Sequence, residues 1–147
     1  MLFDKTYFNK KVLVTGSNGF KGAWLCYWLY KLKAEVIGIG LKNEENNLLF
    51  NKLLMDKKIQ QVYLDITNFE KLNKLVKKNN PDIIFHLAAQ SIVSESYSNP
   101  IKTFNTNLNG SLNVLEVFRK NKIKNLIYVT SDKCYLNKEK KAGYTED

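Results

Sequence analysis

The stretch Thr15-Gly-Ser-Asn-Gly-Phe-Lys-Gly22 stands between an apolar, β-branched run and an amphipathic helical pattern. Its glycines follow the spacing Gly16-x-x-Gly19-x-x-Gly22. In a strand–loop–helix unit, the first glycine permits a tight turn, the second lets the backbone approach a diphosphate, and the third lets the helix lie against the sheet. The free N–H groups and the positive end of the helix then face the phosphates. In this context the motif predicts a dinucleotide-binding loop rather than a ligand-free turn.

Apolar runs and helical patterns alternate on both sides of this loop. Short β-branched runs predict buried strands at Lys11–Thr15, Glu35–Gly40, Gln61–Asp65, Asp82–Leu87 and Asn125–Thr130. Apolar spacings of three and four predict helices at Phe20–Leu32, Leu48–Leu54, Asn68–Lys78 and Lys102–Lys120. A long Ser- and Asn-rich loop is expected before the last helix. Strands separated by helices predict a doubly wound α/β parallel sheet, the Rossmann fold, with strand order 3-2-1-4-5.

Two of these helices have well-marked apolar sets. In the first helix, apolar residues cover most of the surface, and they are Phe20, Ala23, Trp24, Tyr27, Trp28 and Leu32. In the last helix, the predicted apolar set is Leu108, Leu112, Leu115, Val117 and Phe118.

Composition limits the classes of function. The chain has 147 residues, 44% apolar and 12% aromatic, which fits one globular domain. No apolar run approaches the roughly 20 residues of a membrane helix, and the N-terminus lacks the features of a secretory signal, so a cytoplasmic protein with no membrane partner is expected. The net charge of +9 is spread along the chain in pairs such as Lys57-Lys58. This spread favours solvated helix faces over a nucleic-acid-binding surface.

The residues that would contact the coenzyme ribose leave alternatives open. Dinucleotide folds often carry an acid at the end of the second strand, but Lys42 stands there in this sequence. A cation tolerates a 2′-phosphate, so NADP stays open beside NAD, and Glu44 or Glu45 could substitute for the acid. Asp65 ends the third predicted strand, where it either contacts the ligand or caps the next helix.

These segments together resemble the extended short-chain dehydrogenase/reductase family that acts on nucleotide sugars, and the resemblance covers nearly the whole chain. It implies NAD as the coenzyme and a nucleotide sugar as the substrate. The cofactor loop it implies comprises Gly16, Asn18, Gly19, Phe20, Lys21 and Gly22. Asp65 and Ile66 resemble the pair that holds adenine. The segment His86-Leu-Ala-Ala-Gln90 resembles the family's segment that lines the nicotinamide half of the coenzyme site. The binding residues that this resemblance implies are Leu87, Ala88, Ala89 and Gln90, together with Thr106 on the next helix.

Within that family, Thr130-Ser-Asp-Lys-Cys-Tyr135 resembles the 4,6-dehydratases that act on CDP-glucose, because related dehydratases usually carry Asp-Glu where this chain has Asp132-Lys133. The implied reaction oxidises C4 of the sugar, eliminates water between C5 and C6, and reduces C6. Elimination needs a base for the C5 proton and an acid for the C6 hydroxyl. Lys133 and Asp132 are the candidates, and Ser131 is the candidate for polarising the C4 oxygen. Without this context, a solvated turn pair would be the better interpretation.

The family also implies a Tyr-x-x-x-Lys pair, and neither Tyr27–Lys31 nor Tyr7–Lys11 is suitably placed. Residues 1–147 are therefore interpreted as an incomplete Rossmann domain without its substrate-binding portion. The isolated chain is expected to show no turnover. Two alternatives remain: an inactive dinucleotide-binding remnant, and an epimerase or reductase of the same family. His86 and Cys134 are expected to be structural rather than catalytic, and the resemblance also implies a homodimer.

Overall fold

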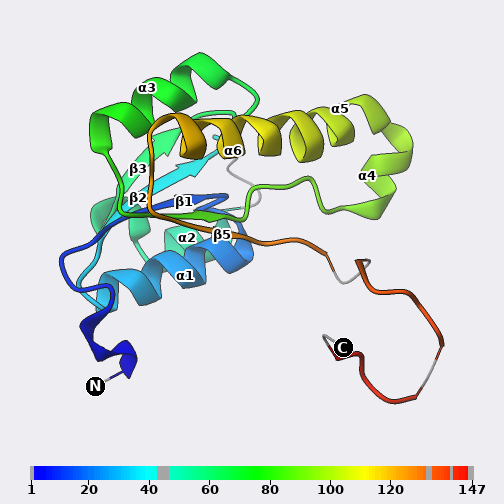
Figure 1. The fold of residues 1–147 in the computed structure, drawn as a ribbon, viewed down its shortest axis with the longest axis horizontal. Coiled ribbons are helices and arrows are strands. Elements are labelled where there is room, and N and C mark those ends of the chain that lie inside the picture. The colour runs from blue at the N-terminus through cyan, green and yellow to red at the C-terminus, as the bar shows by residue number, and fades with distance from the viewer. Residues whose placement is uncertain (1, 43–46, 132–133, 140, 146–147) are drawn as a thin grey trace.

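The structure is a computed structural model that describes residues 2–42, 47–131, 134–139 and 141–145. Within these ranges, the strands form one sheet that has helices on both faces (Figure 1). The strands are β1 (Lys11–Thr15), β2 (Glu35–Gly40), β3 (Gln60–Tyr63), β4 (Ile83–His86) and β5 (Asn125–Tyr128). All pairings are parallel and the order is β3-β2-β1-β4-β5, which confirms the predicted sheet.

The connections between the strands are helical. The helices are α1 (Phe20–Lys31), α2 (Leu48–Lys52), α3 (Phe69–Asn79), α4 (Val93–Ser98), α5 (Pro100–Phe104) and α6 (Ser111–Lys120). Shorter helical segments are η1 (Leu2–Lys5), η2 (Met55–Lys57) and η3 (Asn105–Gly110), the last of which is a π-helical turn. Phe104 and Ser111 at the ends of η3 keep right-handed helical angles, so α5, η3 and α6 form one continuous helix (Figure 1).

Each face of the sheet has its own hydrophobic core, because successive side chains of a strand point to opposite faces. Leu13 of β1 packs with residues of α3 and α6 in one core. Val12 and Val14 pack with residues of α1 and α2 in the other. Figure 1 shows α3 and α6 on one side of the sheet, and α1 and α2 on the other. Burial on both faces accounts for the uninterrupted apolar runs in the strands.

The prediction of a long Ser- and Asn-rich loop before residue 102 is wrong, because α4 and the beginning of α5 lie in this segment. Hydroxyl groups in α4 bond back into the helix: Ser96 Oγ donates to Val93 O at 2.6 Å. Pro100 begins α5 at the position where a missing N–H costs nothing. The local composition suggested a turn, but side-chain bonds to the helix backbone make these residues compatible with helix.

The structure buries only some of the apolar residues that the sequence pattern identified on two helices. In α1 the sheet-facing side is Gly22, Ala23, Cys26 and Leu29, while Phe20, Trp24 and Trp28 are exposed. In η3 and α6 the buried residues are Gly110, Ser111, Val114 and Val117, while Leu108, Leu112 and Leu115 are exposed. The sequence pattern therefore identified apolar residues without showing which of them the fold covers.

The glycine loop joins β1 to α1 through two close backbone contacts. Gly16 has a φ of 72°, a left-handed conformation that favours glycine. A Cβ atom on Gly22 would lie 1.9 Å from the carbonyl oxygen of Gly16. No side chain fits in that gap, so glycine at this position lets the first turn of α1 lie directly against the end of β1.

His86 connects the sheet to α6 through a buried polar chain. Thr15 Oγ1 lies 2.7 Å from His86 Nδ1, and His86 Nε2 lies 3.0 Å from Ser111 Oγ. Thr15 Oγ1 also accepts bonds from the N–H groups of Leu87 and Ala88, both at 3.2 Å. The Thr15 proton is therefore donated to Nδ1, and a neutral ring donates from Nε2 to Ser111. Burial lowers the pKa of His86 to about 4, in keeping with this structural role.

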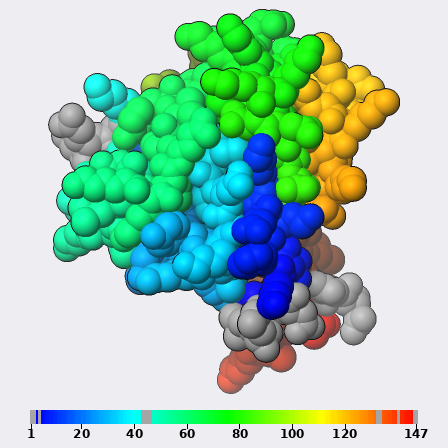
Figure 2. Space-filling view, turned by 90° about the vertical axis from the view of Figure 1, so that its left-hand side faces the viewer, coloured from blue at the N-terminus to red at the C-terminus, as the bar shows by residue number. Residues whose placement is uncertain are grey.

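The two edges of the sheet differ. Near the starts of the strands, the N-terminal residues lie at the surface between the end of α1 and the loop before β4 (Figure 2). Asn9 N donates to Lys33 O at 3.0 Å, and Lys10 pairs with Asp82 at 3.8 Å. The N-terminal residues therefore cover the edge where the strands begin. A ligand-binding site is expected at the opposite edge, where the strands end.

We predict that Gly22→Ala destabilises the protein by about 2–4 kcal/mol, because the new methyl group would force backbone atoms apart. Gly143→Ala is the matched control, since no atom lies within 4 Å of the Cβ it would add. Urea denaturation followed by circular dichroism measures both variants. Equal stabilities of the two variants would contradict the proposed contact.

We further predict that the free energy of unfolding falls by about 2 kcal/mol between pH 7 and pH 5. The unfolded chain protonates its single histidine as the pH drops through about 6.5, whereas the folded chain does so only near pH 4. Stability is therefore complete above pH 6.5 and is lost as the pH falls toward 4. Denaturation at both pH values, together with an NMR titration of the ring, tests this. A ring that titrates above pH 6 in the folded protein would refute it.

Candidate functional site

A cavity of about 570 Å³ lies at the edge where the strands end. It opens between the end of β1 and the end of β4, the adjacent strands whose connections leave toward opposite faces of the sheet. Ligands of doubly wound folds bind at this kind of position. Most of the predicted coenzyme-binding residues line it, namely Gly16, Asn18, Gly19, Phe20, Lys21, Gly22, Asp65, Ile66, Leu87, Ala88, Ala89 and Thr106.

The N-terminus of α1 supplies one wall of the cavity. Gly19 precedes the helix in an extended conformation and has no side chain to cap it. Ala23 N donates to Gly19 O at 2.8 Å, so the N–H groups of Phe20, Lys21 and Gly22 precede the first bond of the helix ladder. The first turn carries no acidic residue, and Lys21 adds a positive charge. This wall is suited to an anionic group such as a diphosphate.

Two side chains inside the glycine loop, those of Ser17 and Asn18, hydrogen-bond to β3 and to the residue that follows β2. Ser17 Oγ donates to Gln61 Oε1 at 2.8 Å, and Asn18 Nδ2 donates to Leu41 O at 2.7 Å. These contacts depend on two strand glycines. A Cβ on Gly38 would lie 2.7 Å from Ser17 Oγ, and a Cβ on Gly40 would lie 1.9 Å from Asn18 Oδ1. The sequence interpretation missed both, although glycine inside a strand often marks a close approach of another segment.

Asp65 and Ile66 follow β3 and form a second wall. Asp65 Oδ1 accepts bonds from Thr67 N at 2.9 Å and Thr67 Oγ1 at 2.8 Å. The helix cap is Asn68, whose side chain accepts from Lys71 N at 3.0 Å, so the alternative of Asp65 as the cap is wrong. Asp65 is thus an exposed carboxylate fixed at the cavity wall, while the Ile66 side chain is buried.

The loop after β4 forms the third wall and is tied to η3. Asn107 Oδ1 accepts from Gln90 N at 2.7 Å, and Asn107 Nδ2 donates to Gln90 O at 2.9 Å. The Gln90 side chain bonds to Ile92 and Thr103, and Gln90 is not among the lining residues. Coenzyme contact by Gln90 therefore stays a prediction, and Asn107, which was not predicted as a binding residue, fixes the position of this loop.

The predicted catalytic segment follows β5. Val129 and Thr130 line the cavity, so the chain leaves β5 at the site. Ser131 is described and exposed, whereas Asp132 and Lys133 lie outside the described residues. Both cysteines are free: Cys134 is exposed, and burial raises the pKa of the Cys26 thiol to about 12.

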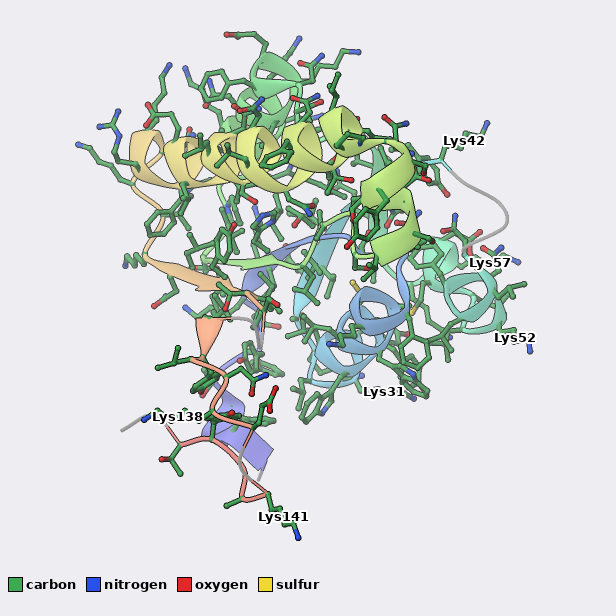
Figure 3. All side chains as sticks on the ribbon, turned by 90° about the vertical axis from the view of Figure 1, so that its right-hand side faces the viewer. Lys31, Lys42, Lys52, Lys57, Lys138 and Lys141 are labelled. Carbon is green, nitrogen blue, oxygen red and sulfur yellow. The ribbon has the colours of Figure 1, made fainter. Side chains whose placement is uncertain are left out.

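Other lining residues come from strand ends and loops that the motif analysis did not select. They are Ile39, Gly40, Leu41, Asn47, Leu64, Ser91 and Val129. Several are apolar residues at carboxyl ends of strands, and that position is the only signal in the sequence that indicates them. Thr130 also lines the cavity; it belongs to the predicted catalytic segment but was not predicted as a binding residue. Lys42 is exposed, and its side chain projects away from the body of the protein (Figure 3).

Neither a metal-ligating cluster nor a membrane-crossing helix occurs among the described residues. No three His, Cys, Asp or Glu side chains gather there as a metal site would require. Within the same part of the chain, no helix has the length and apolar character needed to cross a membrane.

Comparisons with known proteins agree with this geometry. The profile of the GDP-mannose 4,6 dehydratase family matches residues 13–147. CDP-glucose 4,6-dehydratase of Salmonella typhimurium is 39% identical over 99% of this chain and 41% of its own length. The chain thus spans about two fifths of that relative.

Solved structures of epimerases share the fold of this chain. Epimerase Mth375 of Methanothermobacter thermautotrophicus superposes with a TM-score of 0.78 at 31% identity, over 97% of this chain and 41% of that one. UDP-glucose 4-epimerase of Thermus thermophilus, solved in complex with NAD, has a TM-score of 0.69 at 28% identity, over 79% of this chain and 36% of that one. The chain therefore belongs to the nucleotide-sugar epimerase and dehydratase family of extended short-chain dehydrogenases/reductases, in the group described by the GDP-mannose 4,6 dehydratase profile.

Proposed function

We propose that this chain is the coenzyme-binding part of an NAD-dependent nucleotide-sugar 4,6-dehydratase that converts CDP-glucose to CDP-4-keto-6-deoxyglucose. The observation that carries the proposal is the uncapped N-terminus of α1, which faces a cavity at the strand ends. The choice of a dehydratase is supported by 39% identity to CDP-glucose 4,6-dehydratase over 99% of the chain. The proposed coenzyme and substrate also support a cytoplasmic location.

The residues present fit a dinucleotide. The first-turn N–H groups of α1 and the Lys21 side chain would hold the diphosphate. Asp65 would accept bonds from the adenosine half, and Ile66 would pack against its ring. The nicotinamide half would lie against another wall of the cavity, which is formed by Leu87, Ala88, Ala89 and Thr106.

NAD is the proposed coenzyme, and NADP is the alternative. The structure of the Thermus thermophilus relative was solved with NAD, which supports the first. The side chain that follows Leu41 at the end of β2 is a lysine, which would not repel a 2′-phosphate.

The segment after β5 would act on the sugar. Bound NAD would supply a reversible hydride acceptor, so that C4 could be oxidised and C6 reduced with no net redox change. Ser131 would hydrogen-bond the C4 oxygen. Lys133, when neutral, would take the C5 proton, and Asp132, when protonated, would protonate the departing C6 hydroxyl. The acid and the base then lie next to each other in the chain and act on adjacent carbons.

An epimerase is the second candidate, because both solved relatives described above are epimerases. An epimerase inverts a centre and loses no water, so the mass of its product equals that of its substrate. A dehydratase product is lighter by one water. Mass spectrometry of the nucleotide sugar after incubation with NAD therefore separates the two activities. The inactive remnant remains the third alternative, and it would bind coenzyme without forming either product.

We predict that Asp65→Asn weakens NAD binding by about 10- to 100-fold, because hydrogen bonds to a charged group are worth about 1.5–3 kcal/mol. Asp56→Asn is the matched control, since Asp56 is an exposed acid of η2 outside the cavity. Isothermal titration calorimetry gives both dissociation constants. If the two variants bind equally well, Asp65 does not contact the coenzyme.

We also predict that Asp132→Asn and Lys133→Met each lower kcat by about 10²- to 10⁴-fold in a catalytically active protein that contains this chain. The dissociation constant for NAD should not change, because neither side chain is assigned to the coenzyme. Lys138→Met serves as the control, since Lys138 is exposed and lies outside the cavity. Variants that keep more than a third of the parent kcat would rule out the proposed acid–base pair.

A further inference from the structure

Among the described residues, Asn47 is the buried polar residue whose side chain forms no hydrogen bond. Only 7% of its surface is exposed. The polar residues buried in the described part of the chain are Thr15, Ser17, Asn18, Asn47, His86 and Ser111. The side chains of all the others are hydrogen-bonded, some in the polar chain through His86 and the rest in the glycine loop. The Asn47 amide is therefore an exception that the fold does not explain.

Helix capping does not account for this side chain. Asn47 directly precedes α2, a position where asparagine usually caps the helix by accepting a bond from a backbone N–H group. Asn68 caps α3 in this way, because its side chain accepts from Lys71 N at 3.0 Å. The Asn47 side chain makes no capping bond, and only its backbone oxygen takes part, accepting from Asn51 N at 2.9 Å. The amide of Asn47 is thus left over after the helix has formed.

The unbonded amide is accessible from the cavity. A polar atom that is closed off from water and has no partner is strongly unfavourable. Every described side-chain nitrogen or oxygen that the fold closes off from solvent has a hydrogen-bond partner. The Asn47 amide is therefore not closed off, and the cavity is the space that it borders. Because an amide carries two N–H donors and one acceptor oxygen, it can bind the hydroxyl groups of a ligand there.

The sheet order places this amide on the side of the adenosine ribose. β2 lies between β1 and β3, so its end lies between the glycine loop and Asp65, the proposed contacts of the diphosphate and of the adenosine half. The ribose is the part of the coenzyme that joins these two. Gly40 and Leu41 line the cavity at the end of β2 without a polar side chain, and Lys42 projects away from the body of the protein (Figure 3). Asn47 supplies the polar side chain of this connection to the cavity wall.

We propose that the Asn47 amide hydrogen-bonds the 2′-hydroxyl of the adenosine ribose and thereby makes the site selective for NAD over NADP. This inference rests on the proposed function, because it takes a nicotinamide coenzyme as the ligand. The amide oxygen accepts the hydroxyl proton. In NADP a phosphate replaces that proton, and it would place an anion against the amide oxygen in a buried position. Lys21, the one lysine among the described lining residues, is assigned to the diphosphate.

Isothermal titration calorimetry of the chain with NAD and with NADP tests the proposal. The parent should bind NAD at least about 10-fold more tightly than NADP. Asn47→Ala should weaken NAD binding about 5- to 20-fold, because it removes one hydrogen bond and leaves the hydroxyl unpaired, and it should change NADP binding less than about 2-fold. Asn51→Ala is the matched control, since Asn51 is exposed on α2 outside the cavity lining and should leave both affinities unchanged.

An NAD analogue that lacks the 2′-hydroxyl of the adenosine ribose identifies the contacted atom. The parent should bind this analogue more weakly than NAD, by about the factor that Asn47→Ala loses. The analogue should bind the parent and Asn47→Ala equally well, because each change removes the same hydrogen bond. Losses that multiply when the two changes are combined would overturn the proposed contact.

Urea denaturation without coenzyme separates a binding residue from a structural one. The Asn47 amide has no described partner in the free protein, so the midpoints of the parent and of Asn47→Ala should agree closely. A much lower midpoint for Asn47→Ala would assign the side chain to the fold and contradict the inference. If the parent binds NAD and Asn47→Ala binds it as tightly, the inference is refuted and the proposed function is unaffected. If the parent binds neither coenzyme, the proposed function fails, and the inference fails with it.

Discussion

The whole arrangement depends on one backbone contact, in which the first turn of α1 rests against the turn that ends β1. A side chain on Gly22 would meet the carbonyl oxygen of Gly16 at 1.9 Å, so only glycine allows this approach. The contact sets the direction in which α1 leaves the sheet and turns its free N–H groups toward the cavity. Ser17 and Asn18 then hold the same loop against β3 and against the residue that follows β2. One steric constraint thus positions both the fold and the candidate site.

The buried polar chain through His86 has a complementary role on the other side of β1. It links the last residue of β1 with β4 and with α6, and it orients the N–H groups of Leu87 and Ala88 at the cavity wall. The loop that follows is held by Asn107 from the π-helical turn η3. The nicotinamide wall that we propose is therefore connected to the sheet and to η3 by hydrogen bonds, several of them from residues that do not line the cavity.

The sequence predicted the sheet well because strands buried on both faces leave a continuous β-branched signal, and because parallel strands joined by helices allow few topologies. The glycine spacing located the loop because close backbone contacts at these positions leave little or no room for a side chain. The α4 helix was missed because its serines bond to their own backbone, which composition does not reveal. Leu108, Leu112 and Leu115 were recognised as apolar, but whether the fold buries them depends on tertiary packing. Asp132 and Lys133 lie outside the described residues, so the catalytic pair stays a prediction.

The central claim is that backbone N–H groups at the start of α1 bind the diphosphate of a nicotinamide coenzyme. The most direct measurement is an NMR titration of the ¹⁵N-labelled chain with NAD. The account predicts saturable shifts of the Gly19, Phe20, Lys21 and Gly22 amide signals, together with shifts of the Ala88 and Ala89 signals across the cavity. A folded chain whose amide signals at these positions stay unchanged at saturating NAD would contradict it.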